Sequence, residues 1–181
     1  MKLIANFLTL LRIAVIPFII WGFMLEDRDY GNKLILVLFL GASVTDYLDG
    51  KIARMFKATS KFGAMLDPIA DKMLVSVVLI MLVFDRQEHG QPRADLIPVM
   101  IIIMREILVS GLREFLASEQ IAMPVTKLAK WKTTIQFLAL LCLLAAPLVP
   151  GVFIKGTPIY SQQIGEITLW VAAVLTFITG W

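Results

Sequence analysis

Six long apolar runs alternate with short polar connections along this chain. Each run approaches the roughly 20 residues that a helix needs to cross a bilayer, and the connections collect charged and turn-forming residues. The pattern predicts an all-α integral membrane protein with six transmembrane helices in one domain, residues 1–181. The predicted helices are Asn6–Leu25, Lys33–Arg54, Phe62–Phe84, Asp95–Leu116, Leu128–Leu148 and Ile164–Trp181.

The composition agrees with a membrane protein. Hydrophobic residues make up 59% of the sequence, above the range of an ordinary soluble domain. The net charge of +3 does not indicate a nucleic-acid partner, because the basic residues gather in the second and fourth connections. The positive-inside rule places those connections, and with them both termini, in the cytoplasm. The residues concerned are Lys51, Arg54, Lys57 and Lys61, then Lys127, Lys130 and Lys132.

Four aspartates interrupt the apolar pattern near the second connection. Asp46 and Asp49 are three residues apart and Asp67 and Asp71 four apart, so each pair shares one face of a helix. Carboxylates at membrane depth are costly unless positive charge holds them. An all-oxygen site favours Mg²⁺ or Mn²⁺, and four acidic ligands suit two ions about 4 Å apart that clamp a phosphoryl group. We therefore predict a two-metal site for phosphoryl transfer.

Small residues accompany this acidic cluster. Gly50 lies inside a predicted helix, where glycine costs about 1 kcal/mol relative to alanine. Gly50, Ala53 and Gly63 would let a ligand approach the backbone, or would let two helices pack closely. Ligand approach is favoured for Gly50, and both interpretations stay open for Gly63. Arg54 either contacts a phosphate or orients its helix.

These residues form a long signature. The chain contains D-x-x-D-G-x-x-A-R, eight residues, and then G-x-x-x-D-x-x-x-D, with every position and spacing matched. In this it resembles the CDP-alcohol phosphotransferase family. The resemblance implies the six-helix fold of that family, a homodimer in the bacterial inner membrane and an active site that faces the cytoplasm. It also implies that Asp46, Asp49 and Asp67 bind the metals and that Asp71 completes the metal site and acts as general base. The residues that it places along the CDP pocket are Gly50, Ala53, Arg54 and Gly63.

The first predicted helix carries an N-x-x-T-x-x-R pattern at Asn6, Thr9 and Arg12, on one face near its cytoplasmic start. A similar pattern flanks the nucleotide in the family, so the resemblance assigns these three residues to CDP binding. The alternative is an interfacial cap followed by an arginine whose side chain reaches back to the interface.

Basic residues on the fourth and fifth helices indicate an anionic acceptor. Arg105 and Arg113 are eight residues apart, near enough to one face to point into a common cavity, and Lys130 opens the next helix. Together they would hold a doubly charged phosphate. Arg105 needs a partner other than Glu106, since neighbouring residues diverge around a helix. For Lys130 and Lys132 a role as cytoplasmic anchors is the alternative.

Three segments refine the resemblance: M-R-E-I-x-V-S-x-L-R-E from Met104, K-x-K-T-T-x-Q from Lys130, and D-P-x-A-D-K from Asp67. They resemble the family members that form phosphatidylglycerophosphate, although Ala129 stands where such enzymes often have glycine. The expected reaction transfers the phosphatidyl group of CDP-diacylglycerol to glycerol 3-phosphate and releases CMP. The alternatives are another acceptor, phosphatidylglycerol (as in a cardiolipin synthase) or an inositol phosphate, and, in a different class, ion or proton transport.

Overall fold

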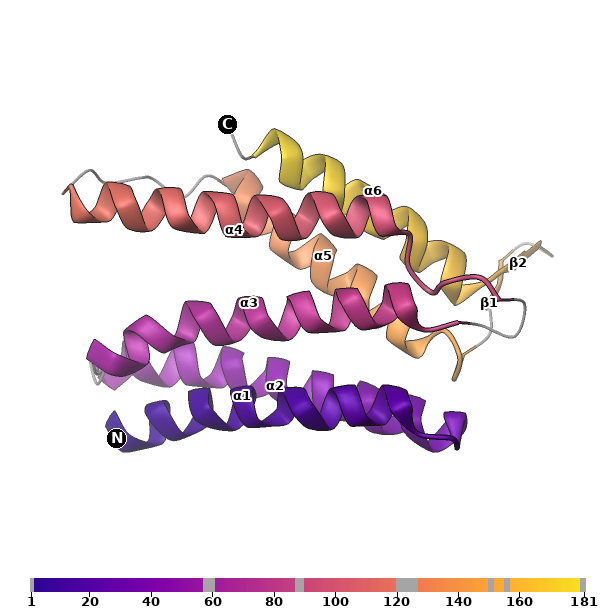
Figure 1. Ribbon diagram of the computed structural model, residues 1–181, viewed down its shortest axis with the longest axis horizontal. Coiled ribbons are helices and arrows are strands. Elements are labelled where there is room, and N and C mark those ends of the chain that lie inside the picture. Colours follow the sequence, from indigo (N-terminus) through magenta and orange to yellow (C-terminus); the bar gives the residue numbers. More distant parts are fainter. Residues whose placement is uncertain are drawn as a thin grey trace. The chain divides into compact units, whose positions relative to one another are not determined.

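The computed structural model describes the backbone of residues 2–56, 61–86, 90–119, 127–149, 152–154 and 157–179. It describes the side chains of residues 7–46, 66–86, 90–119, 131–149 and 160–179. Within these ranges the chain forms six α-helices and one short β-hairpin (Figure 1). The elements are α1 (Lys2–Met24), α2 (Arg28–Phe56), α3 (Lys61–Phe84), α4 (Leu96–Ser118), α5 (Lys127–Ala145), β1 (Val152–Ile154), β2 (Thr157–Ile159) and α6 (Ser161–Ile178).

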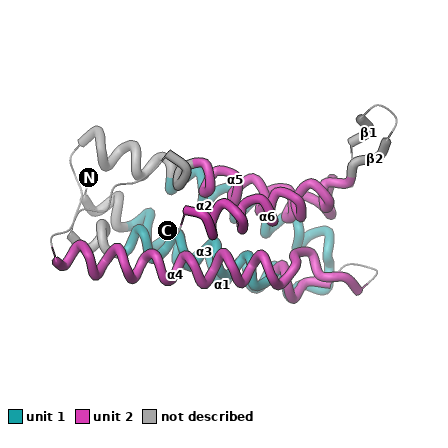
Figure 2. The backbone as a smooth tube through the Cα atoms, turned by 90° about the horizontal axis from the view of Figure 1, so that it is seen from above, with its two compact units in different colours: residues 1–81 teal, residues 82–181 magenta. Residues whose placement is uncertain are grey.

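The six predicted helices are confirmed, and the chain divides into two compact units, Met1–Met81 and Leu82–Trp181 (Figure 2). The first unit holds α1, α2 and nearly all of α3. The second holds the last turn of α3, then α4, α5, the hairpin and α6.

In the first unit, α1 and α2 form a tight antiparallel pair. A β-carbon placed on Gly31 would lie 2.6 Å from the carbonyl oxygen of Gly22, and one on Gly22 would lie 2.7 Å from Ile35 Cγ1. These two glycines therefore let the helix backbones approach more closely than side chains would permit.

The start of α2 differs from the prediction, which placed it at Lys33. The helix begins at Arg28, because Asp27 provides an N-cap: its Oδ1 accepts a hydrogen bond from the backbone N–H of Tyr30 at 3.1 Å. The side chain of Arg28 donates at 3.2 Å to the carbonyl oxygen of Phe23 in the last turn of α1. The polar segment that was expected to be a connection is thus largely the first turn of a helix.

In the second unit, α4 and α5 both pack against α6. The α5–α6 contact is built from fully buried small and branched side chains, with Leu143 of α5 lying against Gly165 of α6. Between α5 and α6, the strands β1 and β2 pair in an antiparallel arrangement, in which Val152 pairs with Ile159. The core of this contact includes Leu140, Leu143, Leu144, Leu169, Ala172 and Ala173.

Polar contacts fix the beginning of α4 in the second unit. Arg93 and Asp85 form a buried ion pair, with Nε 3.0 Å from Oδ2. The Gln162 side chain donates at 2.7 Å to the carbonyl oxygen of Arg93, and Trp170 Nε1 donates at 3.1 Å to Asp95 Oδ2. Asp95 at the start of α4 and Trp170 in the middle of α6 are therefore neighbours. Arg105, further along α4, contacts Thr179 at the end of α6, so α4 and α6 run parallel (Figure 1).

Many large apolar side chains face outward, among them Phe18, Met24, Ile107, Ile167 and Phe177. In the part of the chain that the structure describes, two segments have the length and apolar composition of a membrane span, Phe7–Met24 and Ser161–Ile178. A shorter apolar segment, Trp131–Ala145, lies in α5. An outward apolar surface of this extent is the surface that a helix bundle presents to lipid or to a partner.

Candidate active site

The polar face of α1 contacts a carboxylate on each of the next two helices. Nη2 of Arg12 lies 2.6 Å from Oδ1 of Asp46 on α2. Three residues earlier, the hydroxyl of Thr9 donates a hydrogen bond to Oδ1 of Asp67 on α3. Residues three apart lie on one helical face, so two aspartates that are distant in sequence meet the same short stretch of α1.

Arg12 supplies a positive charge beside the carboxylate of Asp46. Its side chain is 1% exposed, whereas that of Asp46 is 48% exposed. The guanidinium is therefore held inside the unit while the carboxylate remains open to a ligand. This burial is incompatible with the alternative in which Arg12 reaches back to the membrane interface, since such a side chain keeps its charged head in water.

Arg12 also keeps unused hydrogen-bonding capacity. Its Nε and Nη1 atoms are buried and have no hydrogen-bond partner in the part of the chain that the structure describes. A guanidinium has five N–H donors, and buried donors without partners are uncommon. Asp67 and Asp71, by contrast, have exposed side chains on α3. The arrangement combines a buried cation with carboxylates that a solvent-borne ligand can reach.

The donor chemistry suits a hard divalent cation. Asp46 and Asp67 both offer carboxylate oxygens, and the single histidine and single cysteine of the sequence, His89 and Cys142, belong to other segments. No group of three or more potential metal ligands occurs among the side chains that the structure describes, which do not include Asp49. An oxygen-only donor set is the kind that Mg²⁺ or Mn²⁺ prefers.

Several predicted site residues lie outside the described side chains, and their roles stay predictions. Their backbones belong to α1, α2, α3 and α5, as the sequence pattern predicts. These residues are Asn6, Asp49, Gly50, Ala53, Arg54, Gly63 and Lys130.

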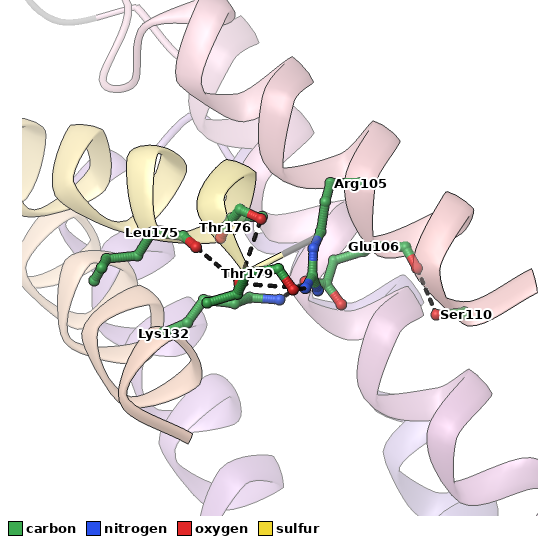
Figure 3. Close-up of polar contacts among 7 residues, drawn as sticks. All are labelled: Arg105, Glu106, Ser110, Lys132, Leu175, Thr176 and Thr179. Atoms are coloured by element: carbon green, nitrogen blue, oxygen red, sulfur yellow. Dashed lines mark hydrogen bonds and ion pairs between the residues drawn. The ribbon is translucent and has the colours of Figure 1, made fainter. Parts of the chain in front are cut away.

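A second polar cluster lies in the other unit, where α4, α5 and the end of α6 meet (Figure 3). Nη2 of Arg105 donates to the carbonyl oxygen of Thr179 at 2.7 Å and to its Oγ1 at 3.2 Å. Lys132 of α5 forms a charged hydrogen bond with Oε1 of Glu106. The expectation that Arg105 finds a partner away from its own helix is thus met by Thr179.

Three observations on this cluster bear on the sequence interpretation. Arg105 and Glu106 do form an ion pair, with Nη1 3.6 Å from Oε1, because both long side chains bend toward the same point. Lys132 is 6% exposed and paired, so it is no surface anchor. Arg113, expected to share a cavity with Arg105, is exposed on α4. The contact between Lys132 and Glu106 joins residues 26 positions apart, so no local sequence pattern predicts it.

The helical fold, the paired Thr9–Asp67 and Arg12–Asp46 contacts and the acidic signature define a class. The chain belongs to the CDP-alcohol phosphatidyltransferase family, whose model matches residues 2–178. Members of this family are embedded in membranes.

The similarity to individual relatives extends over nearly the whole chain. The CDP-diacylglycerol–glycerol-3-phosphate 3-phosphatidyltransferase of Rickettsia typhi is 46% identical over 181 residues, 100% of this chain and 94% of the relative. The protein of the same name from Rickettsia felis is 45% identical over 99% of this chain and 92% of its own length. That from Haemophilus influenzae is 39% identical over 94% of this chain and 85% of its own length. The expected family is therefore confirmed.

Proposed function

We propose that this chain transfers the phosphatidyl group of CDP-diacylglycerol to glycerol 3-phosphate and releases CMP. The observation that carries the proposal is the convergence of Asp46 and Asp67 on the Thr9–Arg12 face of α1. It supports a site for a pyrophosphate within the signature segments. The choice of glycerol 3-phosphate is supported by the names of relatives that match nearly the full length of this chain.

The reaction is a substitution at phosphorus. The sn-1 hydroxyl oxygen of glycerol 3-phosphate forms a bond to the β-phosphorus, and the bond from that phosphorus to the oxygen bridging to CMP breaks. CMP leaves with that oxygen, and Asp71 takes the hydroxyl proton as general base. The exposed position of Asp71 on α3 is compatible with access to an acceptor from water.

Four acidic residues would together hold the divalent cations: Asp46, Asp49, Asp67 and Asp71. When bound, two Mg²⁺ or Mn²⁺ ions neutralise pyrophosphate charge and stabilise the leaving group. Arg12, buried and with donors to spare, and Thr9 would orient the nucleotide together with Asn6. Gly50, Ala53, Arg54 and Gly63 would line the rest of the CDP pocket.

The second unit would bind the acceptor. Arg105, Arg113 and Lys130 are assigned to the phosphate of glycerol 3-phosphate, because guanidinium groups suit the geometry of a phosphate dianion. Of these, Arg105 is the one whose side chain is held by described contacts. We further propose that the chain spans the membrane six times, with this chemistry at the cytoplasmic side, and that it works as a homodimer.

Transfer of glycerol 3-phosphate into lipid tests the proposal. Purified protein in detergent, supplied with CDP-diacylglycerol, Mg²⁺ and glycerol 3-phosphate labelled in its phosphate, should move the label into the lipid fraction. One CMP should appear for each labelled lipid, and chelation of the metal should stop both. CMP formed without labelled lipid, or transfer that persists after chelation, would contradict the reaction or its metal dependence.

A further inference from the structure

Glu106 lies between the two cations of the polar cluster in the second unit. Its Oε1 binds the Lys132 ammonium and is 3.6 Å from Nη1 of Arg105. All three side chains are at least 80% buried. Figure 3 shows them pointing toward one another from α4 and α5. One carboxylate therefore fixes two basic groups that come from different helices.

The end of α6 fixes the other side of the Arg105 guanidinium. Thr179 follows the last residue of α6, and its backbone N–H bonds to the carbonyl oxygen of Leu175 at 3.0 Å, which continues the helical pattern. The last carbonyl groups of a helix lack partners within it, and at the end of α6 Arg105 donates to the carbonyl oxygen of Thr179. Cations are favoured at this end of a helix. Arg105 thus has one nitrogen held by α6 and another beside Glu106.

This arrangement leaves a net positive charge with restricted motion. Two cations and one carboxylate sum to one positive charge, and Nε of Arg105 is buried without a hydrogen-bond partner among the described residues. Free arginine and lysine side chains lose rotamer entropy when a ligand fixes them in one orientation. Contacts that hold them before a ligand arrives reduce what binding must overcome. A small dianion gains most from such an arrangement, because it contacts the basic groups directly.

We propose that Glu106 is a positioning residue for the acceptor: it orients Arg105 and Lys132 so that both face the phosphate of glycerol 3-phosphate. This inference rests on the proposed function and adds Lys132 to the acceptor site. Ser110, one turn along α4, donates a hydrogen bond to the backbone carbonyl of Glu106. A purely structural ion pair would affect stability and both substrates alike, whereas a positioning residue affects the acceptor selectively.

The test is Glu106→Gln, which keeps the shape of the side chain and removes its charge. We expect the KM for glycerol 3-phosphate to rise about tenfold or more, since a hydrogen bond to a charged group contributes about 1.5–3 kcal/mol. The KM for CDP-diacylglycerol should stay unchanged, and kcat should fall far less than kcat/KM for the acceptor. Glu114→Gln is the matched control, because Glu114 is an exposed residue of the same helix; it should behave as the unmodified protein.

A double variant tests whether Glu106 acts through Lys132. If it does, adding Lys132→Met to Glu106→Gln should raise the KM for glycerol 3-phosphate by less than the product of the two separate effects. Effects that simply multiply would overturn the inference, as would equal rises in both KM values. If Glu106→Gln does not fold, Glu106→Asp replaces it: a selective rise in the acceptor KM supports the proposal and no rise overturns it.

Different results would refute the proposed function and the positioning role of Glu106. Unmodified protein that transfers nothing to glycerol 3-phosphate would refute the proposed function. Active unmodified protein with an unchanged acceptor KM in Glu106→Gln would refute the positioning role alone.

Discussion

Thr9 and Arg12 bring together carboxylates that the sequence separates by about twenty residues. The hydroxyl and the guanidinium lie one turn apart on α1 and reach Asp67 on α3 and Asp46 on α2. Burying a guanidinium is expensive unless it is paired, so the Arg12–Asp46 contact accounts for the presence of an arginine inside an apolar helix. The same contact keeps the carboxylate of Asp46 at the edge of the unit, where a ligand can reach it.

Asp71 is the residue that we propose as the general base. Asp71→Asn removes the proton acceptor and a negative charge while it preserves the size of the side chain. Since Asp71 is exposed, the fold should tolerate the change, and thermal unfolding in detergent should match that of the unmodified protein. CMP release in the presence of glycerol 3-phosphate should fall by about a hundredfold or more, the usual scale of a general base. Substantial turnover in this variant would contradict the assignment.

Sequence spacing predicted part of this residue-level picture. The 3.6-residue period put Thr9 and Arg12 on one face. The structure confirms that the two residues share a face, where they contact Asp67 and Asp46. Spacing could not decide which of Lys130 and Lys132 is a site residue, because either lysine at the start of α5 can anchor a helix at the interface. The burial of Lys132 depends on Glu106, and that contact arises only when α4 and α5 fold together.

At the scale of elements, glycines set how closely helices approach. Gly31 faces the backbone of Gly22, so the α1–α2 pair has no room for a β-carbon there. The carboxylate of Asp46 and the guanidinium of Arg12 belong to the same pair of helices. Any shift between α1 and α2 would therefore change the distance between Arg12 and Asp46.

Gly31→Ala should destabilise the protein. The added β-carbon would meet a carbonyl oxygen at 2.6 Å, and relieving such overpacking costs about 1–3 kcal/mol. The midpoint of thermal unfolding in detergent should fall. Gly41→Ala is the control in the same helix, since a β-carbon there meets nothing within 4 Å; its midpoint should be unchanged or higher. A Gly31→Ala midpoint at or above that of the unmodified protein would show that the close approach is not needed.

The elements themselves were largely predictable. The long apolar runs predicted the number of helices. In lipid, an isolated apolar segment can satisfy its backbone hydrogen bonds within itself only as a helix. The start of α2 was missed, since Asp27 looks like one more loop residue until its carboxylate is seen to cap Tyr30. The pairing of β1 with β2 was also missed, because the Pro and Gly residues of this segment are loop signals.

At the scale of the whole molecule, the chain carries two kinds of chemistry in two units. Carboxylates with a buried arginine belong to the first, and a basic cluster organised around Glu106 belongs to the second. The family was predictable from the sequence because its signature is long and fully matched. The proposed acceptor site was harder to predict, since Arg105 contacts Thr179 and Lys132 contacts Glu106, and both partners are far away in sequence.

Acceptor selectivity is the most direct test of the account as a whole. Rates of CMP release from CDP-diacylglycerol should be measured with one acceptor at a time: glycerol 3-phosphate, an inositol phosphate, phosphatidylglycerol and serine. We expect release to depend on glycerol 3-phosphate and on Mg²⁺ or Mn²⁺, with the other three acceptors giving little above the rate without acceptor. Faster release with another alcohol would contradict the assignment of the basic cluster. Absence of release with all four, from folded protein, would contradict transferase activity itself and favour transport.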